Sequence, residues 1–477
     1  MLPRTWYTSR PEPHRPDRLM KTTRIKPLDA VWLMMETSDT PMHMGVLSVF
    51  QKPRNCGAKY FVQLAEQMRS VQPVAPWNYR LAKGIGYRTV VDEDFDIDYH
   101  FRRSALPEPG GERELGQMIS RLHSSALDLG RPLWEVHLIE GLERDRFALY
   151  IKMHHALVEG VNGVPALLAT LSHSARSRSV EPLWAQPPVN RDQHEDIAEN
   201  LQWPGLAESI DSAAAMGRAA LGLLSGALRP SERNSFLLPR GTPRSTLNRR
   251  INAQRRFATQ QFDQQRIEAV ADATDSTVNE ILTYLCGSSL RRFFKEYNAL
   301  PDESLVGMIP VSLQERGQHL AGNAIAGLRM PLGTHIADPL KRLQCVKKTM
   351  KEVRRDRASL PEESVTSYVL LRAAPIYASQ IEKLGQFVPP LYNLAVSNTA
   401  GAEKTCYYNG ARLEAVYPLN PLLQFSALSI DCVSYAGTLN VGFTGARDTL
   451  PHLQRMAVYL GKALADLEEL VAKGEAA

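Results

Sequence analysis

Alternation of apolar and polar positions predicts several strands in the first part of the chain. In FDIDYHF, residues 95–101, apolar and aromatic side chains occupy every second position, the pattern of a strand with one face in water. WEVHLIE at 134–140 and RFALYIKM at 146–153 predict two more strands joined by a short turn. Helical spacing predicts helices over 112–127 and 163–172. This mixture indicates an α/β fold.

Composition divides the chain into two blocks of strand and helix patterning. Residues 1–24 are rich in proline and arginine and predict a disordered tail. Met20, within this tail, is an alternative start of translation. We expect a first lobe over 25–185 and a second lobe over 246–477. Between them, 186–245 predicts a linker that is first proline-rich, then a helical stripe of alanine and leucine, then basic.

Charge and motif content exclude several functional classes. The 56 basic and 51 acidic residues leave a net charge of +5, too small to indicate nucleic-acid binding by itself. The five cysteines are widely spaced and form no Cys-x-x-Cys, which argues against a disulfide framework or zinc site and favours a reducing compartment. No P-loop, Gly-x-Ser-x-Gly or complete Gly-x-Gly-x-x-Gly pattern occurs. No apolar run approaches the ~18 residues of a membrane span, and the N-terminus lacks the apolar region of a secretory signal. We expect a cytoplasmic protein, or one peripheral at the inner membrane or a lipid droplet.

Two adjacent histidines, His154 and His155, end one predicted strand and are the main candidates for chemistry. Neighbours on a strand point to opposite faces, so we do not expect the two imidazoles to share a metal ion, and no metal is expected. His155 has the parity of the apolar positions, where burial and a helix start favour a neutral imidazole that can act as a general base. Glu159 and Gly160 lie at that helix start, where a carboxylate is expected to fix the turn. The alternative is that both histidines are structural.

This stretch resembles the HHxxxDG motif of bacterial wax ester synthase/diacylglycerol acyltransferases, a family of the CoA-dependent acyltransferase superfamily. The resemblance covers LDLGRPLWEVHLIEGLERDRFALYIKMHHALVEG at 127–160 and extends from about residue 27 to about residue 470. Further matching elements are the FDIDYHF segment, QRRFA at 254–258, TVNE at 277–280, PVSL at 310–313, Gly322-Asn323 and VSNTAGA at 396–402.

The resemblance implies two chloramphenicol-acetyltransferase-like α/β sandwich lobes with the active-site channel between them. It implies that His155 takes the proton of a fatty alcohol or diacylglycerol hydroxyl, which attacks an acyl-CoA thioester. Acyl-CoA is then a co-substrate, and no cofactor is expected. His154 and Asn279 are the other catalytic candidates, since a polar side chain can orient substrate or stabilise an oxyanion. Glu280 is expected to support the site, although Thr277-x-x-Glu280 is also a capping-box pattern, and we favour that structural role.

Substrate contacts are expected from the Pro-Leu-Trp element, the Ser-Asn pair and two arginines, namely Pro132, Leu133, Trp134, Ser397, Asn398, Arg255 and Arg256. The arginines suit CoA phosphates or an anionic lipid surface, with a solvated connector as the alternative. The uncharged segment 415–430 is apolar enough to line an acyl tunnel, to form buried strands, or both.

Three departures from the family pattern bear on activity. Glu159 and Glu280 stand where the family has aspartate, and 397–402 lacks both prolines of the family's Ser-Asn-Val-Pro-Gly-Pro element. A misplacement of about 1 Å can lower a rate roughly 100-fold. From the resemblance as a whole we expect an acyl-CoA:alcohol O-acyltransferase that makes wax esters, triacylglycerol or both. Because of the three departures, the alternative is a weak or silent lipid-binding paralogue. A condensation-type enzyme that uses a carrier-protein thioester is a third hypothesis, disfavoured by the Pro-Leu-Trp and Gly-Asn elements.

Overall fold

A computed structural model describes the chain over residues 22–25, 27–54, 56–82, 86–157, 163–186, 242–310, 327–358, 379–380 and 385–474. Several predicted features lie outside the described residues. They are nearly all of the tail, most of the linker, Glu159, Gly160, residues 311–313 and Gly322-Asn323.

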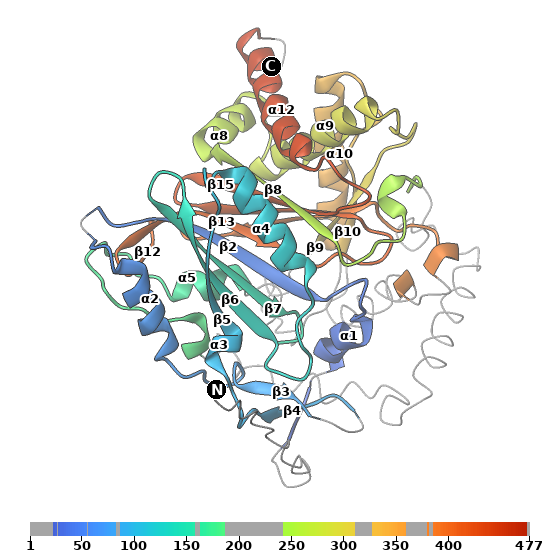
Figure 1. Ribbon diagram of the computed structural model, residues 1–477. Coiled ribbons are helices and arrows are strands. Elements are labelled where there is room, and N and C mark those ends of the chain that lie inside the picture. The colour runs from blue at the N-terminus through green and yellow to red at the C-terminus, as the bar shows by residue number, and fades with distance from the viewer. Residues whose placement is uncertain are drawn as a thin grey trace, which may run out of the picture.

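Six strands form a first mixed sheet (Figure 1). In spatial order they are β12 (Tyr407–Tyr408), β13 (Ala411–Leu419), β2 (His43–Gln51), β7 (Arg146–His154), β6 (Trp134–Leu142) and β5 (Phe101–Ala105). β5 and β6 run parallel, and the other neighbours run antiparallel. The strands predicted over 134–140 and 146–153 are confirmed as β6 and β7.

Helices cover both faces of this sheet because β7 is apolar on both. Phe147, Leu149 and Ile151 pack in one cluster with residues of α2 (Tyr60–Arg69) and α5 (Gly163–Ala169). Ala148 and Tyr150 pack on the other face against α4 (Glu112–Ser124). The predicted helices over 112–127 and 163–172 are thus confirmed with shorter C-terminal ends. Smaller elements of this lobe are β1 (Thr23–Arg24), β3 (Tyr79–Leu81), β4 (Arg88–Val91), α1 (Pro27–Met35) and the 3-10 helix η2 (Leu183–Ala185).

The strand predicted over 95–101 is wrong. Ile97–His100 form one helical turn, α3, because the Asp96 carboxylate accepts a hydrogen bond from the Asp98 N–H at 3.0 Å and caps it. His100 is fully buried, and its Nδ1 is 2.7 Å from the Trp134 carbonyl oxygen, so it does not face water. Apolar and polar residues do alternate here, but the Asp96 cap and the buried hydrogen bond of His100 determine the conformation.

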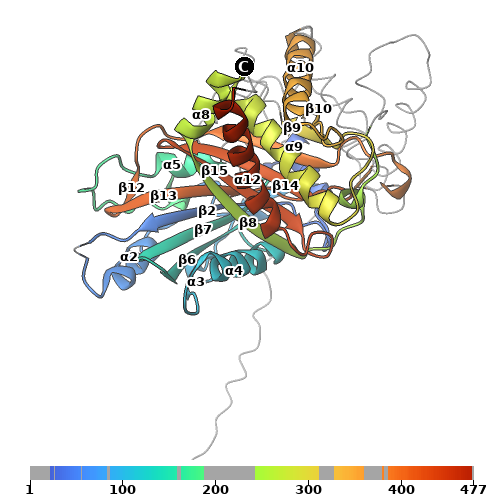
Figure 2. The ribbon, with the colours of Figure 1, turned by 90° about the horizontal axis from the view of Figure 1, so that it is seen from above.

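The second mixed sheet contains β10 (Gly327–Pro331), β9 (Val306–Pro310), β11 (Leu394–Ala400), β14 (Leu428–Tyr435), β15 (Thr438–Ala446) and β8 (Arg255–Asp263), in that spatial order. Its outer face packs against α8 (Gln264–Ala273), α9 (Val278–Glu296) and α12 (Gln454–Ala472), with α10 (Pro339–Ala358) beside α9 (Figure 2). The 3-10 helices η3 (Thr246–Asn248) and η6 (Gly385–Phe387) complete this lobe.

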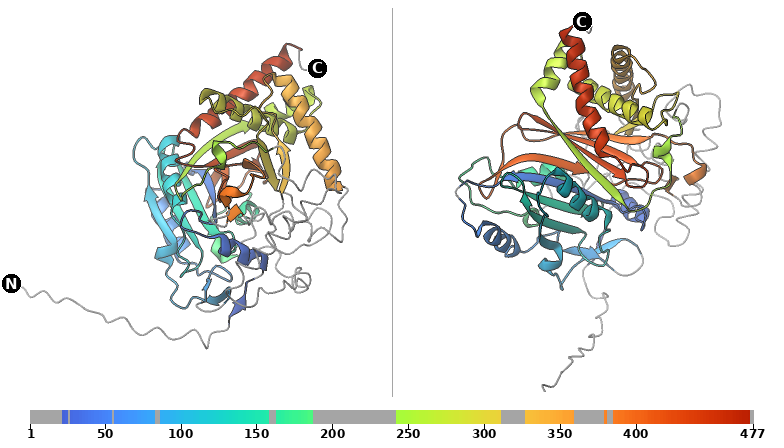
Figure 3. Two further views of the ribbon diagram at one scale, coloured as in Figure 1. Left: turned by 90° about the vertical axis from the view of Figure 1, so that its right-hand side faces the viewer. Right: turned by 45° about the horizontal axis from the view of Figure 1, so that its top comes forward.

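The two lobes share secondary structure (Figure 3). Strands β12 and β13 come from the second half of the sequence, yet β13 pairs with β2 and extends the first sheet. The residue ranges expected for the lobes did not include this crossover. None of the helices in the described ranges combines the length and the hydrophobicity that a membrane span requires.

Candidate active site

The histidine pair lies where β7 ends, and the first histidine is fixed by hydrogen bonds. Nδ1 of His154 accepts the Ala156 N–H at 3.0 Å, so the proton of a neutral ring resides on Nε2. That Nε2 is 3.3 Å from a carboxylate oxygen of Glu36, which also accepts the Met42 N–H. His154 is buried, and its N–H donates to the Leu133 carbonyl at 2.9 Å. Through these contacts His154 stabilises the turn that follows β7.

The second histidine follows the strand and has different surroundings. The His155 N–H donates to the Met42 carbonyl at 2.9 Å. Its imidazole stacks on the indole of Trp32, with ring centroids 3.6 Å apart and an interplanar angle of 11°. Burial, together with the charge of the neighbouring His154, lowers the pKa of His155 from 6.5 to about 3. This shift favours the neutral form of the ring at pH 7.

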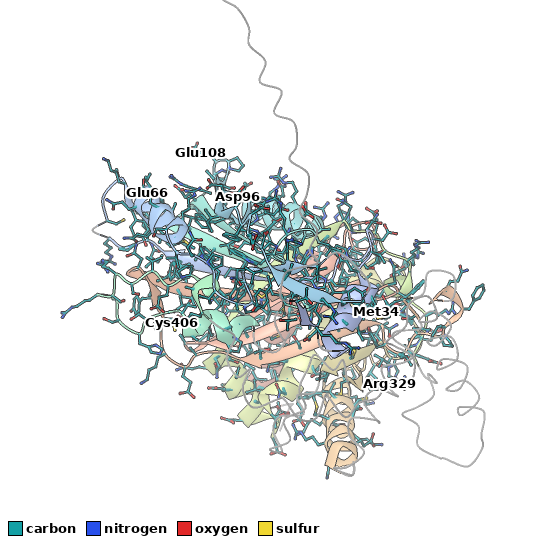
Figure 4. All side chains as sticks on the ribbon, turned by 90° about the horizontal axis from the view of Figure 1, so that it is seen from below. Met34, Glu66, Asp96, Glu108, Arg329 and Cys406 are labelled. Atoms are coloured by element: carbon teal, nitrogen blue, oxygen red, sulfur yellow. The ribbon has the colours of Figure 1, made fainter. Side chains whose placement is uncertain are left out.

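This site lies at the junction of the two lobes. Trp32 belongs to an apolar cluster that draws Met35 and Met42 from the first lobe and Val306, Met308, Tyr392 and Leu423 from the second. In Figure 4, Met34 marks α1 and Arg329 marks β10, and both lie on the same side of the molecule. A cavity of about 210 Å³ borders the cluster at Tyr392. Gln424, Phe425 and Ser426 of the apolar segment 415–430 line part of this cavity, and the rest of its wall includes Arg244, Asn248 and Leu391.

The two second-lobe motifs meet each other. Nδ2 of Asn398 on β11 donates to Oδ1 of Asn279 on α9 at 2.8 Å, and both side chains are exposed. The capping box is confirmed: the Thr277 hydroxyl accepts the Glu280 N–H at 3.3 Å, and the Glu280 carboxylate accepts the Thr277 N–H at 2.8 Å. Glu280 is also 3.6 Å from Arg354. Its described contacts are structural, whereas the two asparagine side chains are exposed and bonded to each other.

A buried carboxylate supports the Ser-Asn element and was missed in the sequence. Asp431 on β14 is fully buried and accepts hydrogen bonds from Ser397 Oγ at 2.7 Å, Asn420 Nδ2 at 2.6 Å and Ser429 Oγ at 2.8 Å. Burial raises the pKa of Asp431 from 3.8 to about 6, and the three hydrogen bonds hold it below what burial alone would give. The only signal for it was one acidic residue inside the apolar run LSIDCVSY.

A second buried polar group lies in the first lobe, around Lys152 of β7. Nζ of Lys152 is 3.2 Å from the Glu135 carboxylate and donates to two backbone carbonyls near the end of α4. Burial lowers the pKa of Lys152, and Glu135 opposes that shift. For Glu135, burial favours the neutral form, but a hydrogen bond from His137 and the charge of Lys152 outweigh it and lower the pKa to about 2. Tyr150, two residues before Lys152 on β7, forms a 2.8 Å hydrogen bond between its hydroxyl and Nδ1 of His123.

The remaining candidate residues lie in the core or between the lobes. Leu133 and Trp134 are buried, and the Trp134 Nε1–H donates to the Trp77 carbonyl at 2.7 Å. This element supports the histidine turn through the Leu133 carbonyl, which accepts the His154 backbone N–H. Arg255 is buried, and it donates to the carbonyls of Asn252, by a short bond, and Asp39, at 3.3 Å. Those bonds tie the lobes together and leave the guanidinium unsuited to phosphate. A role of Arg256 in substrate binding stays a prediction.

Comparison with known proteins identifies the family of this chain. The family model described as "Wax ester synthase/diacylglycerol acyltransferase catalytic domain" matches residues 25–282, and "WS/DGAT C-terminal domain" matches 321–468. A putative diacylglycerol O-acyltransferase of Mycobacterium tuberculosis is 38% identical over 481 residues, with 93% of this chain and 97% of that protein covered. A second, probable diacylglycerol O-acyltransferase of the same organism is 36% identical over 453 residues, with 94% and 99% covered.

Solved structures give the same result. A wax ester synthase/diacylglycerol acyltransferase from Marinobacter aquaeolei VT8 aligns with a TM-score of 0.78 at 31% identity, over 94% of this chain and 100% of that one. The starter condensation domain of rhizomide synthetase aligns with a TM-score of 0.52 at 14% identity, over 94% of each chain, which is a likeness of fold alone.

Proposed function

Because the chain belongs to the wax ester synthase/diacylglycerol acyltransferase family, we propose that it transfers a long-chain acyl group from acyl-CoA to the hydroxyl of a fatty alcohol or a diacylglycerol. The family, the two-lobed α/β fold and the O-acyltransferase class expected from the sequence are confirmed. The observation that carries the finer proposal is the neutral imidazole of His155 at the junction of the lobes.

In the proposed reaction, His155 removes the proton of the acceptor hydroxyl. A neutral imidazole can accept a proton, which is what a general base requires. The alcohol oxygen forms a bond to the thioester carbonyl carbon, and the carbon–sulfur bond breaks. The departing CoA thiolate takes the proton from the imidazolium, which restores the base. Acyl-CoA is a substrate, and no acyl-enzyme is needed.

The other groups support this step in distinct ways. Glu36 and the Leu133 carbonyl hold His154, and His154 precedes the base directly in the chain. We assign the exposed amides of Asn279 and Asn398 to substrate orientation or oxyanion stabilisation. The cavity beside Tyr392 suits an apolar acyl or alkyl chain, because burial of methylenes contributes about 0.8 kcal/mol each without directional contacts.

The test is thiol release by the purified protein with palmitoyl-CoA and either hexadecanol or dioleoylglycerol, with the ester identified by mass spectrometry. His155→Ala should lower turnover roughly 100- to 10,000-fold with an unchanged melting temperature. His335→Ala, at an exposed histidine of the second lobe, is the matched control and should be fully active. Ester formation by His155→Ala at the wild-type rate would refute the role of the base. An inactive wild-type protein that still binds palmitoyl-CoA would instead support the lipid-binding paralogue.

Both acceptors are lipids, so we infer that the protein works at a membrane or droplet surface. Phe387 is 73% exposed, and it directly precedes the cavity wall formed by residues 388–392. Flotation with phosphatidylglycerol vesicles tests this, and a protein that stays in the dense fraction both with and without dioleoylglycerol would contradict it.

A further inference from the structure

The imidazole of His155 is stacked directly on the indole of Trp32. The two rings are nearly parallel at 3.6 Å, so the imidazole lies flat on the indole. Trp32 is 6% exposed and is held among the apolar residues that join the lobes. The π face of an indole has negative potential and attracts a cation that lies over it. The geometry therefore places such a face directly against the proposed base.

The indole nitrogen makes no comparable contribution. Nε1 of Trp32 is buried, and within the described part of the chain it has no hydrogen-bond partner. A buried N–H without a partner is destabilising. Phenylalanine would fill much of the same space without that disadvantage. A tryptophan here therefore points to a property of the ring face, and indole binds cations more strongly than the other aromatic side chains do.

A cation arises at this position during the proposed reaction. When the acceptor hydroxyl gives up its proton, the imidazole of His155 becomes an imidazolium until CoA thiolate takes that proton. Within the part of the chain that the structure describes, His154 and Glu36 are the titratable groups of the histidine turn, and neither favours this imidazolium. His154 disfavours positive charge on His155, and the Glu36 carboxylate is engaged with His154 and with the Met42 N–H. Burial disfavours the charge as well.

We propose that Trp32 is a positioning residue whose indole face stabilises the imidazolium of His155 as it forms. This rests on the proposed role of His155 as the base. The stabilised charge exists only after proton transfer has begun, so Trp32 should act on kcat and leave KM nearly unchanged. The same stack fixes the plane of the imidazole before the proton moves.

Fluorinated tryptophans test the electrostatic part directly. Fluorine withdraws electron density from the ring face but keeps its shape, its stacking and its N–H. The chain has six tryptophans, so the protein is labelled throughout with mono-, di- or trifluorotryptophan, and Trp32→Phe labelled in the same way is the matched control. Single-turnover rates of the otherwise wild-type protein should fall stepwise, by roughly five- to thirty-fold at the trifluoro form. The Trp32→Phe series should be flat. Equal declines in both series, or none in either, would overturn the proposal.

Two unlabelled variants separate this inference from the proposed function. Trp32→Phe should retain part of kcat and Trp32→Leu less, both with wild-type KM. If His155→Ala is inactive and Trp32→Leu has full kcat, the role of Trp32 is refuted while the base remains. If His155→Ala is active, the proposed function itself fails. If Trp32→Leu does not fold, the fluorinated series still decides.

Discussion

Replacing Asp431 by asparagine should change how stability depends on pH. Burial raises its folded-state pKa to about 6, whereas the ordinary value is 3.8. The folded protein therefore binds this proton more tightly than the unfolded chain does. The protonated carboxyl favours the native state below pH 3.8, and that stabilisation is lost as pH rises to about 6. Two pKa units at 1.36 kcal/mol each give about 3 kcal/mol of instability above pH 6 from this group.

Asparagine has nearly the same shape and carries no charge at any pH. Its carbonyl oxygen can accept from Ser397 and Asn420, as the carboxylate does, and its amide can donate to Ser429 Oγ. Asp431→Asn should therefore be more stable than wild type at pH 8 by up to about 3 kcal/mol. This advantage should shrink as pH falls towards 4.

The assay is thermal melting of wild type and Asp431→Asn at several pH values between 4.5 and 8. The quantity compared is the difference between the two melting temperatures at each pH. The difference removes the contribution of other carboxyl groups, which titrate alike in both proteins. Asp272→Asn, at an exposed position of α8, is the control and should show no pH-dependent difference. A constant difference for Asp431→Asn across this range would refute the reasoning, because the buried carboxylate would then have an ordinary pKa.

Two further substitutions test the groups around the histidine strand. Glu36→Gln removes the charge opposite His154 Nε2, so kcat should fall by roughly tenfold through misplacement of the turn, and a rise in KM alone would contradict that explanation. Lys152→Met leaves the buried Glu135 without its closest cation and should destabilise the fold by about 3–5 kcal/mol in a melting experiment. Adding Glu135→Leu should recover most of the loss, and a double variant no more stable than Lys152→Met would show that the ion pair is not the cause.

The parts of the site that are close in sequence could be predicted, because local patterns determine them. Strand parity placed His154 and His155 in different surroundings, and the Thr277-x-x-Glu280 pattern predicted a cap that the structure contains. Apolar periodicity also located β6 and β7. These predictions depend on contacts within a few residues along the chain.

The parts that depend on long-range contacts could not be predicted. Glu36 meets His154 across more than a hundred residues, and no local pattern marks it as a partner. The role of Asp431 depends on hydrogen bonds from Ser397 and Asn420, which only the folded chain brings next to it. The error at 95–101 has the opposite origin, since one capping aspartate outweighed a clear alternation.

The crossover of β13 into the first sheet has a consequence for dissecting the protein. A fragment that ends before the second lobe would lack the strand that pairs with β2, whose nine residues are almost entirely buried. Its apolar edge would then be unpaired and prone to aggregate. The complementary fragment would carry β13 without a sheet to join. Co-expression of the two pieces should therefore yield soluble protein when neither piece does so alone, which makes the linker a place for fragment complementation and not a boundary between independent folding units.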